Sequence, residues 1–241
     1  MSIENKKVVI TGAGGGIGRE IALSVARAGA YPILFGGNNI EKLQKTAELI
    51  AEFGECAIIP GDLTDDEVLL ESVQTLLSEF DGVDILINNA GLACNVSFEQ
   101  TDTELFDKIM NINCRVPFLL TQKLLPSIKK SDYATIINIA SVVSHAGYPN
   151  QSAYTASKHA LLGFTKSLAN EVFTDGVRVH AISPGGVYTD MVKVSRPDLT
   201  PDGMIMPTEI ADIVMFLLNN RGNAVIDEII VHRLTKPPFQ V

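Results

Sequence analysis

The stretch Lys6-Lys-Val-Val-Ile-Thr-Gly-Ala-Gly-Gly-Gly-Ile-Gly18 decides how this chain folds. Its first half is a short apolar run typical of a buried strand, and residues 17–28 continue with apolar side chains at helical spacing. The glycines between them permit a tight turn and let a pyrophosphate approach the main chain, where free N–H groups at the helix N-terminus attract an anion. A flexible turn is the alternative, but five glycines in eight residues between a strand and a helix favour a dinucleotide-binding loop.

Strand-like and helix-like segments alternate along the rest of the chain, which predicts crossover units and a parallel sheet covered by helices on both faces. Apolar runs predict strands over residues 6–10, 31–35, 56–60, 83–87, 134–139, 177–182 and 225–231. Helical patterns cover residues 17–28, 40–53, 65–80, 101–130 and 208–218, and a further helix carries Tyr154 and ends near residue 173. We expect Pro117 to divide the 101–130 helix and Thr208 to cap the last helix. Residues 1–241 are therefore expected to form a single α/β domain, a Rossmann fold with a doubly wound, seven-stranded parallel sheet.

Five polar or glycine-containing motifs each follow directly after a predicted strand. They contain Gly12, Asp62, Asn89, Ser141 and Pro184. In sheets of this kind, ligands bind at the carboxyl ends of the strands. The sequence therefore predicts one site along one edge of the sheet.

Tyr154 and Lys158 are four residues apart on a predicted helix, so their Cβ atoms lie about 5–6 Å apart on one face. An ammonium held near 4 Å from the phenol, in an effective dielectric of about 20, favours the phenolate by about 4 kcal/mol. That corresponds to about three pKa units, so we expect the Tyr154 phenol to titrate near neutral pH and to act as a general acid or base. Ser141 is placed to bind the oxygen that gains or loses the proton. Ordinary helix surface is the alternative for the Tyr-x-x-x-Lys pair taken alone.

Composition narrows the classes of partner. The chain has 241 residues and a net charge of −9, which disfavours nucleic acid and anionic membrane surfaces as partners. It contains no apolar run long enough to span a membrane and no signal-peptide pattern, and its three cysteines have unrelated spacings. We therefore expect a cytoplasmic protein with reduced thiols and no metal site.

Taken together, these motifs resemble those of the short-chain dehydrogenase/reductase family over nearly the whole chain. The matching segments are Thr-Gly-x-x-x-Gly-x-Gly at 11–18, Asn-Asn-Ala-Gly at 88–91, and the Asn, Ser and Tyr-x-x-x-Lys set. The resemblance implies hydride transfer between a nicotinamide cofactor and a carbonyl or secondary alcohol. It implies that Tyr154 is the catalytic acid or base, that Lys158 lowers its pKa, that Ser141 binds the substrate carbonyl, and that Asn113 holds a water in a proton relay.

The same resemblance implies a set of cofactor-binding residues. Besides Tyr154 and Lys158 these are Thr11, Gly12, Gly14, Gly15, Gly16, Ile17, Gly18, Gly37, Asn38, Asp62, Leu63, Asn89, Ala90, Gly91, Pro184, Gly185, Val187 and Thr189. Residues 36–39 fall where such folds read the adenosine ribose, and they contain neither an acid that would select NAD nor a cation that would bind a 2′-phosphate. Relatives with a neutral pair at the positions of Gly37 and Asn38 often take NADP, so we expect NADP and keep NAD as the alternative.

The motifs are closest to those of 3-oxoacyl-[acyl-carrier-protein] reductases, and we expect NADPH-dependent reduction of a 3-oxoacyl thioester or a small keto compound. The alternatives are a sugar or polyol dehydrogenase of the same family, or a non-catalytic dinucleotide sensor. The C-terminal residues 223–241 depart from the family pattern. The prolines and glycine near residues 197–207 suggest a substrate lid over residues 190–207. The family also implies a homodimer or homotetramer.

Overall fold

The structure is a computed structural model that describes residues 2–195 and 200–237. Seven parallel strands form one sheet in the order β3-β2-β1-β4-β5-β6-β7, which confirms the predicted doubly wound sheet. The strands are β1 Lys7–Thr11, β2 Tyr31–Phe35, β3 Ala57–Ile59, β4 Ile85–Asn88, β5 Thr135–Ile139, β6 Arg178–Pro184 and β7 Glu228–Val231. The chain order reverses between β1 and β4, so the sheet has its topological switch point beside the glycine loop.

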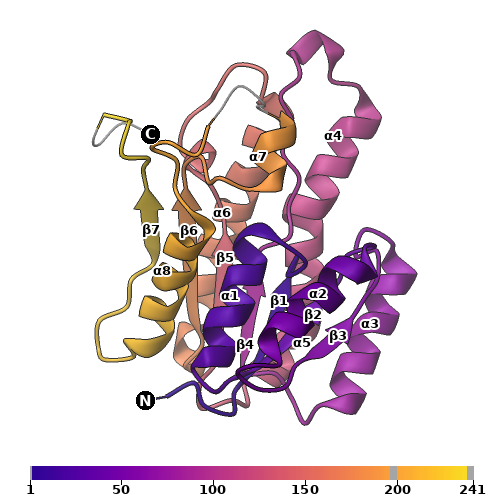
Figure 1. Cartoon of the computed structure of the whole chain (residues 1–241), viewed down its shortest axis with the longest axis vertical. Helices are drawn as coiled ribbons and strands as arrows, with labels where there is room; N and C mark the ends of the chain where they lie inside the picture. Colours follow the sequence, from indigo (N-terminus) through magenta and orange to yellow (C-terminus); the bar gives the residue numbers. More distant parts are fainter. Residues whose placement is uncertain (1, 196–199, 238–241) are drawn as a thin grey trace.

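Helices cover both faces of the sheet, as Figure 1 shows. On one face, α1 (Gly16–Arg27), α2 (Ile40–Ile50) and α8 (Pro207–Asn219) contribute to one apolar core. On the other face, α3 (Asp66–Glu79), α5 (Val116–Ile128) and α6 (Ser152–Val172) contribute to a second core. Strands β4 and β5 are buried on both faces, which explains their nearly continuous apolar sequences.

Two further helices, α4 (Thr103–Met110) and α7 (Asp190–Ser195), lie beyond the carboxyl ends of the strands (Figure 1). Short helical turns occupy Phe98–Gln100, Val142–Ser144 and Phe173–Asp175. Within the described residues, no helix is long and apolar enough to cross a membrane. The three cysteines are free thiols.

The predicted break in the 101–130 helix exists, but it does not lie at Pro117. The interruption is a π-helical turn over Asn111–Arg115, where the N–H of Val116 donates to the carbonyl of Asn111, five residues back. Pro117 lies in the first turn of α5, where a missing N–H costs little. The extra residue of the π turn accommodates the inward-pointing side chain of Asn113, described below.

Two other assignments differ from prediction, and a third falls partly outside the described residues. Helix α8 begins at Pro207, and the Glu209 carboxylate accepts a hydrogen bond from the Met206 N–H (2.6 Å), so Thr208 is not the cap. Strand β7 begins at Glu228 rather than at residue 225. Residues 196–199 of the predicted lid lie outside the described residues; of the remainder, 190–195 form α7, and Met204 and Ile205 are buried.

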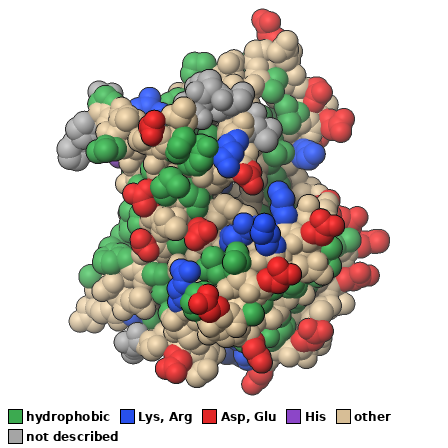
Figure 2. Space-filling model, in the orientation of Figure 1, with side chains coloured by type: hydrophobic (Ala, Val, Ile, Leu, Met, Phe, Trp, Pro, Cys, Tyr) green, Lys and Arg blue, Asp and Glu red, His purple; other side chains and the backbone are tan. Residues whose placement is uncertain are grey.

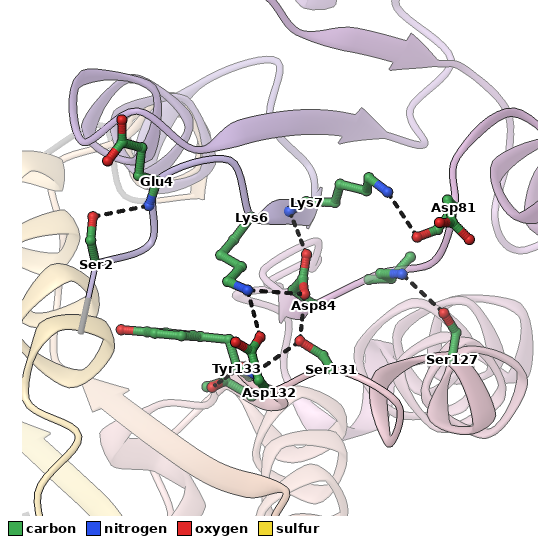
Figure 3. Close-up of polar contacts among 12 residues, drawn as sticks. Ser2, Glu4, Lys6, Lys7, Asp81, Asp84, Ser127, Ser131, Asp132 and Tyr133 are labelled. Carbon is green, nitrogen blue, oxygen red and sulfur yellow. Dashed lines mark hydrogen bonds and ion pairs between the residues drawn. The ribbon is translucent and has the colours of Figure 1, made fainter.

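Polar contacts close the opposite edge of the sheet, where the strands begin. Figure 3 shows Asp84 between β1 and β5: its carboxylate accepts hydrogen bonds from the Lys7 N–H (2.8 Å) and the Ser131 hydroxyl. Lys6 pairs with Asp132 at 2.5 Å in the same group. These contacts tie together the N-terminal ends of the central strands and lie away from the edge that carries the predicted motifs.

Candidate active site

The glycine loop is packed against the Asn-Asn-Ala-Gly turn that follows β4. Gly12 has a φ of +69°, and a Cβ at this position would lie 3.0 Å from the Cα of Ala90. A Cβ on Gly18 would collide with the carbonyl oxygen of Gly12 and would lie 2.5 Å from the side-chain nitrogen of Asn89. Thr11 accepts hydrogen bonds on its hydroxyl from the N–H groups of Asn89 and Ala90, both at 2.9 Å. The loop is thus a rigid turn at the start of α1, with the shape that a pyrophosphate requires.

The other side of the glycine loop faces the segment that follows β6. A Cβ on Gly16 would lie 3.1 Å from the methyl group of Thr189. Val187 pairs with Ile205 in an isolated parallel bridge, and the N–H of Gly185 donates to the carbonyl of Val231 (2.7 Å). The structure therefore brings the two predicted cofactor-binding segments, 11–18 and 184–189, into contact, while Ile17 turns inward onto the core.

The predicted ribose-reading corner lies at the ends of β2 and β3. Gly37 and Gly61 form an isolated bridge, and the Asn38 amide donates to the Asp62 carboxylate (2.9 Å). Hydrogen bonds from Thr64 and Asn38 lower the pKa of Asp62, so this group is an anion at neutral pH. The Leu63 side chain is buried beneath Gly36, which leaves only its main chain for a ligand.

The lysine of the Tyr-x-x-x-Lys pair lies between two of the predicted motifs. The Lys158 ammonium donates to the carbonyl of Ile139 (2.7 Å), at the end of β5, and a Cβ on Gly91 would lie 3.7 Å from its nitrogen. The Lys158 side chain is only 5% exposed, and burial lowers its pKa from 10.5 to about 8. This lysine therefore links the Asn-Asn-Ala-Gly turn to the end of β5, next to Ser141.

Asn113 is fully buried beside Lys158 and holds the same turn. Its side-chain oxygen accepts from the Leu92 N–H (2.7 Å), and its side-chain nitrogen donates to the Leu92 carbonyl (2.8 Å) and to the Ser157 hydroxyl (2.9 Å). The side chain thus uses both its polar atoms on protein partners. The two hydrogen bonds to the Leu92 main chain hold this residue, which follows Gly91, in place.

Ser141 and Tyr154 complete the cluster. The Ser141 hydroxyl donates to the Pro184 carbonyl and accepts from the Val143 N–H, both at 3.3 Å, which are long and weak hydrogen bonds. Its side chain also acts on Tyr154, where it opposes the effect of burial on the phenol. The Lys158 nitrogen lies 6.0 Å from the centre of the Tyr154 ring, so the two side chains share one face of α6 as predicted.

The expected pKa of Tyr154 is wrong in this structure. Burial raises the pKa of the phenol above its ordinary value of 10, and the Ser141 side chain only partly offsets that rise. The Lys158 ammonium donates to the Ile139 carbonyl, and its charge is not among the causes that lower the pKa of Tyr154. At neutral pH the Tyr154 hydroxyl therefore carries its proton.

Sequence reasoning missed the residues that support this cluster. Ser157, fully buried, receives a hydrogen bond from Asn113 and donates to the Tyr154 carbonyl (2.7 Å). Glu228 in β7 accepts from Ser183 (2.5 Å) and pairs with His145 (2.6 Å), which ties the segment after Ser141 to the last strand. Two adjacent acidic residues, Asp227 and Glu228, within an otherwise apolar run were the signal for Glu228, whereas Ser157 carried none.

The arrangement defines a class of protein: a dinucleotide-binding oxidoreductase with Ser, Tyr and Lys side chains at the carboxyl edge of the sheet. Comparison with known proteins agrees. The model of the short chain dehydrogenase family matches residues 6–200. The 3-oxoacyl-[acyl-carrier-protein] reductase of Aquifex aeolicus is 32% identical over 240 residues, covering 95% of this chain and 96% of the relative.

Solved structures show the same relationship. An alcohol dehydrogenase from Thermococcus sibiricus, complexed with 5-hydroxy-NADP, superposes with a TM-score of 0.88 at 29% identity and covers 97% of this chain and 98% of its own. A short-chain dehydrogenase structure from Shigella flexneri, complexed with NADP, gives a TM-score of 0.87 at 31% identity and covers 95% and 97%. The chain belongs to the short-chain dehydrogenase family and is an oxidoreductase.

Proposed function

We propose that this protein uses NADPH to reduce the carbonyl group of a 3-oxoacyl thioester or a small keto compound. The observation that carries the proposal is the cluster of Ser141, Tyr154 and Lys158 beside the glycine loop. The choice of reduction rests on the similarity to 3-oxoacyl-[acyl-carrier-protein] reductases. Reduction of a carbonyl requires a proton donor, and the Tyr154 hydroxyl would supply that proton. NADP in the related structures and the neutral residues Gly37 and Asn38 support the choice of cofactor.

The residues present fit a nicotinamide dinucleotide. A Cβ at Gly12 or Gly18 would crowd or collide with neighbouring atoms of the loop or of the Asn-Asn-Ala-Gly turn. Glycine at both positions therefore preserves the tight turn that a pyrophosphate can approach. Asn89, Ala90 and Gly91 would flank the cofactor's ribose, and Val187 and Thr189 would hold the nicotinamide end. When bound, the cofactor supplies the hydride, and the protein supplies orientation and the proton.

In the proposed reaction, the Ser141 hydroxyl donates a hydrogen bond to the substrate carbonyl oxygen, and Tyr154 hands its proton to that oxygen. The weak bonds of Ser141 to Pro184 and Val143 leave its hydroxyl free to turn to a stronger acceptor. Lys158, protonated below about pH 8, places a positive charge on the same face of α6 as the phenolate left behind. Asn113 would hold a water in a proton relay behind Lys158, and its side chain also fixes Leu92 and Ser157.

The test is the Tyr154→Phe variant with NADPH and a panel of ketones, 3-oxoacyl thioesters and keto sugars. We expect at least a hundredfold loss of carbonyl-dependent NADPH oxidation with unchanged NADPH binding, because the change removes only the proton donor. Tyr31→Phe is the matched control, since Tyr31 begins β2 at the opposite edge of the sheet. If the wild type binds NADPH tightly but reduces no carbonyl, the protein is a dinucleotide sensor and the proposal is wrong.

We also propose a cytoplasmic homodimer or homotetramer. Phe98 (80% exposed), Phe106 and Phe118 present aromatic surface on and around α4 and α5, and aromatic side chains of this kind are enriched in subunit interfaces. Light scattering coupled to gel filtration tests the assembly. A monomer at micromolar concentration would contradict it.

A further inference from the structure

The proposed use of NADPH raises a question that the loop residues do not answer. NADP differs from NAD by a 2′-phosphate on the adenosine ribose, and proteins bind that group with a cation. Gly15, Gly37 and Asn38, the residues at the predicted positions, carry no charge. The Asn38 amide is also engaged with Asp62 (2.9 Å), whose negative charge repels a phosphate.

The tertiary structure brings a lysine from α2 to the glycine loop. A Cβ on Gly14 would lie only 3.1 Å from the Cβ of Lys42, so the Lys42 side chain begins beside the loop. Lys42 lies in the first turn of α2, where its N–H donates to the capping side chain of Asn39 (3.0 Å). The residue is exposed, and its ammonium makes no hydrogen bond or ion pair with any residue that the structure describes.

There is open space at the glycine loop and at the end of β2. A Cβ added to Gly15, or to Gly37 at the end of β2, would have no neighbouring atom within 4 Å. These are the two positions between which the adenosine ribose is expected. Figure 2 shows Lys and Arg side chains grouped near the centre of this face, over the region where α1 and α2 lie in Figure 1. The flexible four-carbon stem of a lysine lets its charge turn into the adjacent opening.

Arg19, the other cation near the glycine loop, already makes hydrogen bonds there. The Arg19 guanidinium donates to the Gly14 carbonyl (2.6 Å) and to the Thr46 hydroxyl (3.1 Å), and Thr46 donates in turn to the Ala13 carbonyl (3.0 Å). These bonds fasten α2 to the glycine loop and fix the place from which Lys42 extends. Lys193 donates a hydrogen bond to the Asp190 carboxylate (3.1 Å) and lowers its pKa most. The charges of Lys42 and Arg19 lower the pKa of Asp190 further.

We propose that Lys42 pairs with the adenosine 2′-phosphate and is the residue that makes this protein prefer NADPH to NADH. The inference rests on the proposed function only in its use of a nicotinamide dinucleotide. The cation comes from the helix after the ribose-reading loop, across the space left by Gly15. This explains how a chain with no charge in the loop itself selects the phosphorylated cofactor.

The experiment measures binding rather than turnover. Dissociation constants of NADPH and NADH are determined by the fluorescence of the reduced nicotinamide for the wild type, Lys42→Met and Lys45→Met. Lys45 is the matched control because it is an exposed lysine of the same helix, one turn farther along. We expect Lys42→Met to weaken NADPH binding by about tenfold to a hundredfold, the usual strength of one charge-assisted pair, and to leave NADH binding within about twofold. Lys45→Met should change neither.

A second variant guards against a purely structural effect of Lys42→Met. Gly15 has an extended φ of −178° and an unobstructed Cβ position, so it accepts an arginine. We expect Gly15→Arg in the Lys42→Met background to restore NADPH binding. Equal losses for the two cofactors in Lys42→Met, no loss at all, or a wild type that prefers NADH would each overturn the inference. A wild type that binds neither dinucleotide would instead contradict the proposed function.

Discussion

At the scale of the residue, the decisive groups are the buried amine of Lys158 and the buried phenol of Tyr154. Each changes the pKa of the other less than their spacing on the helix implies. Four residues on a helix bring Tyr154 and Lys158 onto one face, but the direction of each side chain decides what the charge does. Lys158 points at the Ile139 carbonyl, and burial lowers its pKa to about 8. Burial raises the pKa of Tyr154, so both residues are driven toward their neutral forms.

The lowered pKa of Lys158 makes a prediction about stability. The folded protein releases this proton near pH 8, whereas the unfolded chain holds it to about pH 10.5, so between these values the unfolded state binds more protons. The free energy of unfolding should therefore rise with pH in this range, by about 2 kcal/mol between pH 7.5 and 9.5. Below about pH 8 the folded protein holds the Lys158 amine in its charged form, and the cost of burying that charge lowers the free energy of unfolding by its full amount.

Urea denaturation of the wild type and Lys158→Met at several pH values measures this contribution. The difference in unfolding free energy between the two should grow with pH, because other titrating groups cancel. Lys166→Met, an exposed lysine of the same helix, serves as control. Parallel pH profiles for the wild type and Lys158→Met would show that the buried amine does not titrate in this range.

At the scale of the element, the turn between β1 and α1 depends on close approach of main chains. Gly18 leaves no room for a methyl group because the Gly12 carbonyl and the Asn89 side chain lie against it. Gly15, three residues earlier, faces open space with an extended backbone. Glycines of one motif are therefore present for different physical reasons.

Gly18→Ala should destabilise the protein by about 1–3 kcal/mol and weaken dinucleotide binding at least tenfold, because the new methyl group forces the loop away from the Asn-Asn-Ala-Gly turn. Gly15→Ala should leave binding within about twofold and stability unchanged or slightly increased. Thermal unfolding and fluorescence titration with NADPH measure both. Equal tolerance of the two alanines would contradict the packing described here.

At the scale of the whole molecule, the carboxyl edge of the sheet carries the site and the amino edge carries contacts that stabilise the fold. The predicted site residues gather at the carboxyl edge, where Pro184 ends β6, and Gly12, Gly91 and Ser141 follow the ends of β1, β4 and β5. The opposite edge carries the group around Asp84, which joins β1 to β5 (Figure 3). Neither of these two contacts reaches the glycine loop or α6.

Asp84→Ala tests this division. Removal of the carboxylate leaves the Lys7 N–H and the Ser131 hydroxyl without their acceptor, so the free energy of unfolding should fall by about 1–3 kcal/mol. Binding of NADPH should stay within about twofold of the wild type, as measured in native buffer by fluorescence. Asn113→Ala, by comparison, should lose both stability and binding, since Asn113 holds Leu92 at the site. A loss of binding in Asp84→Ala would mean that the two edges are coupled.

The sequence by itself determined the sheet, the alternation of strands and helices, and the edge at which the motifs meet. These depend on local periodicity and on the rule that parallel strands end together, so the order of residues is enough to read them. Only the tertiary structure decided the π turn at Asn111–Arg115, the hydrogen bond between Glu228 and His145, the raised pKa of Tyr154 and the position of Lys42 beside Gly14. Each of these depends on how deeply a group is buried or on which distant segment packs against it, and spacing along the chain contains neither quantity.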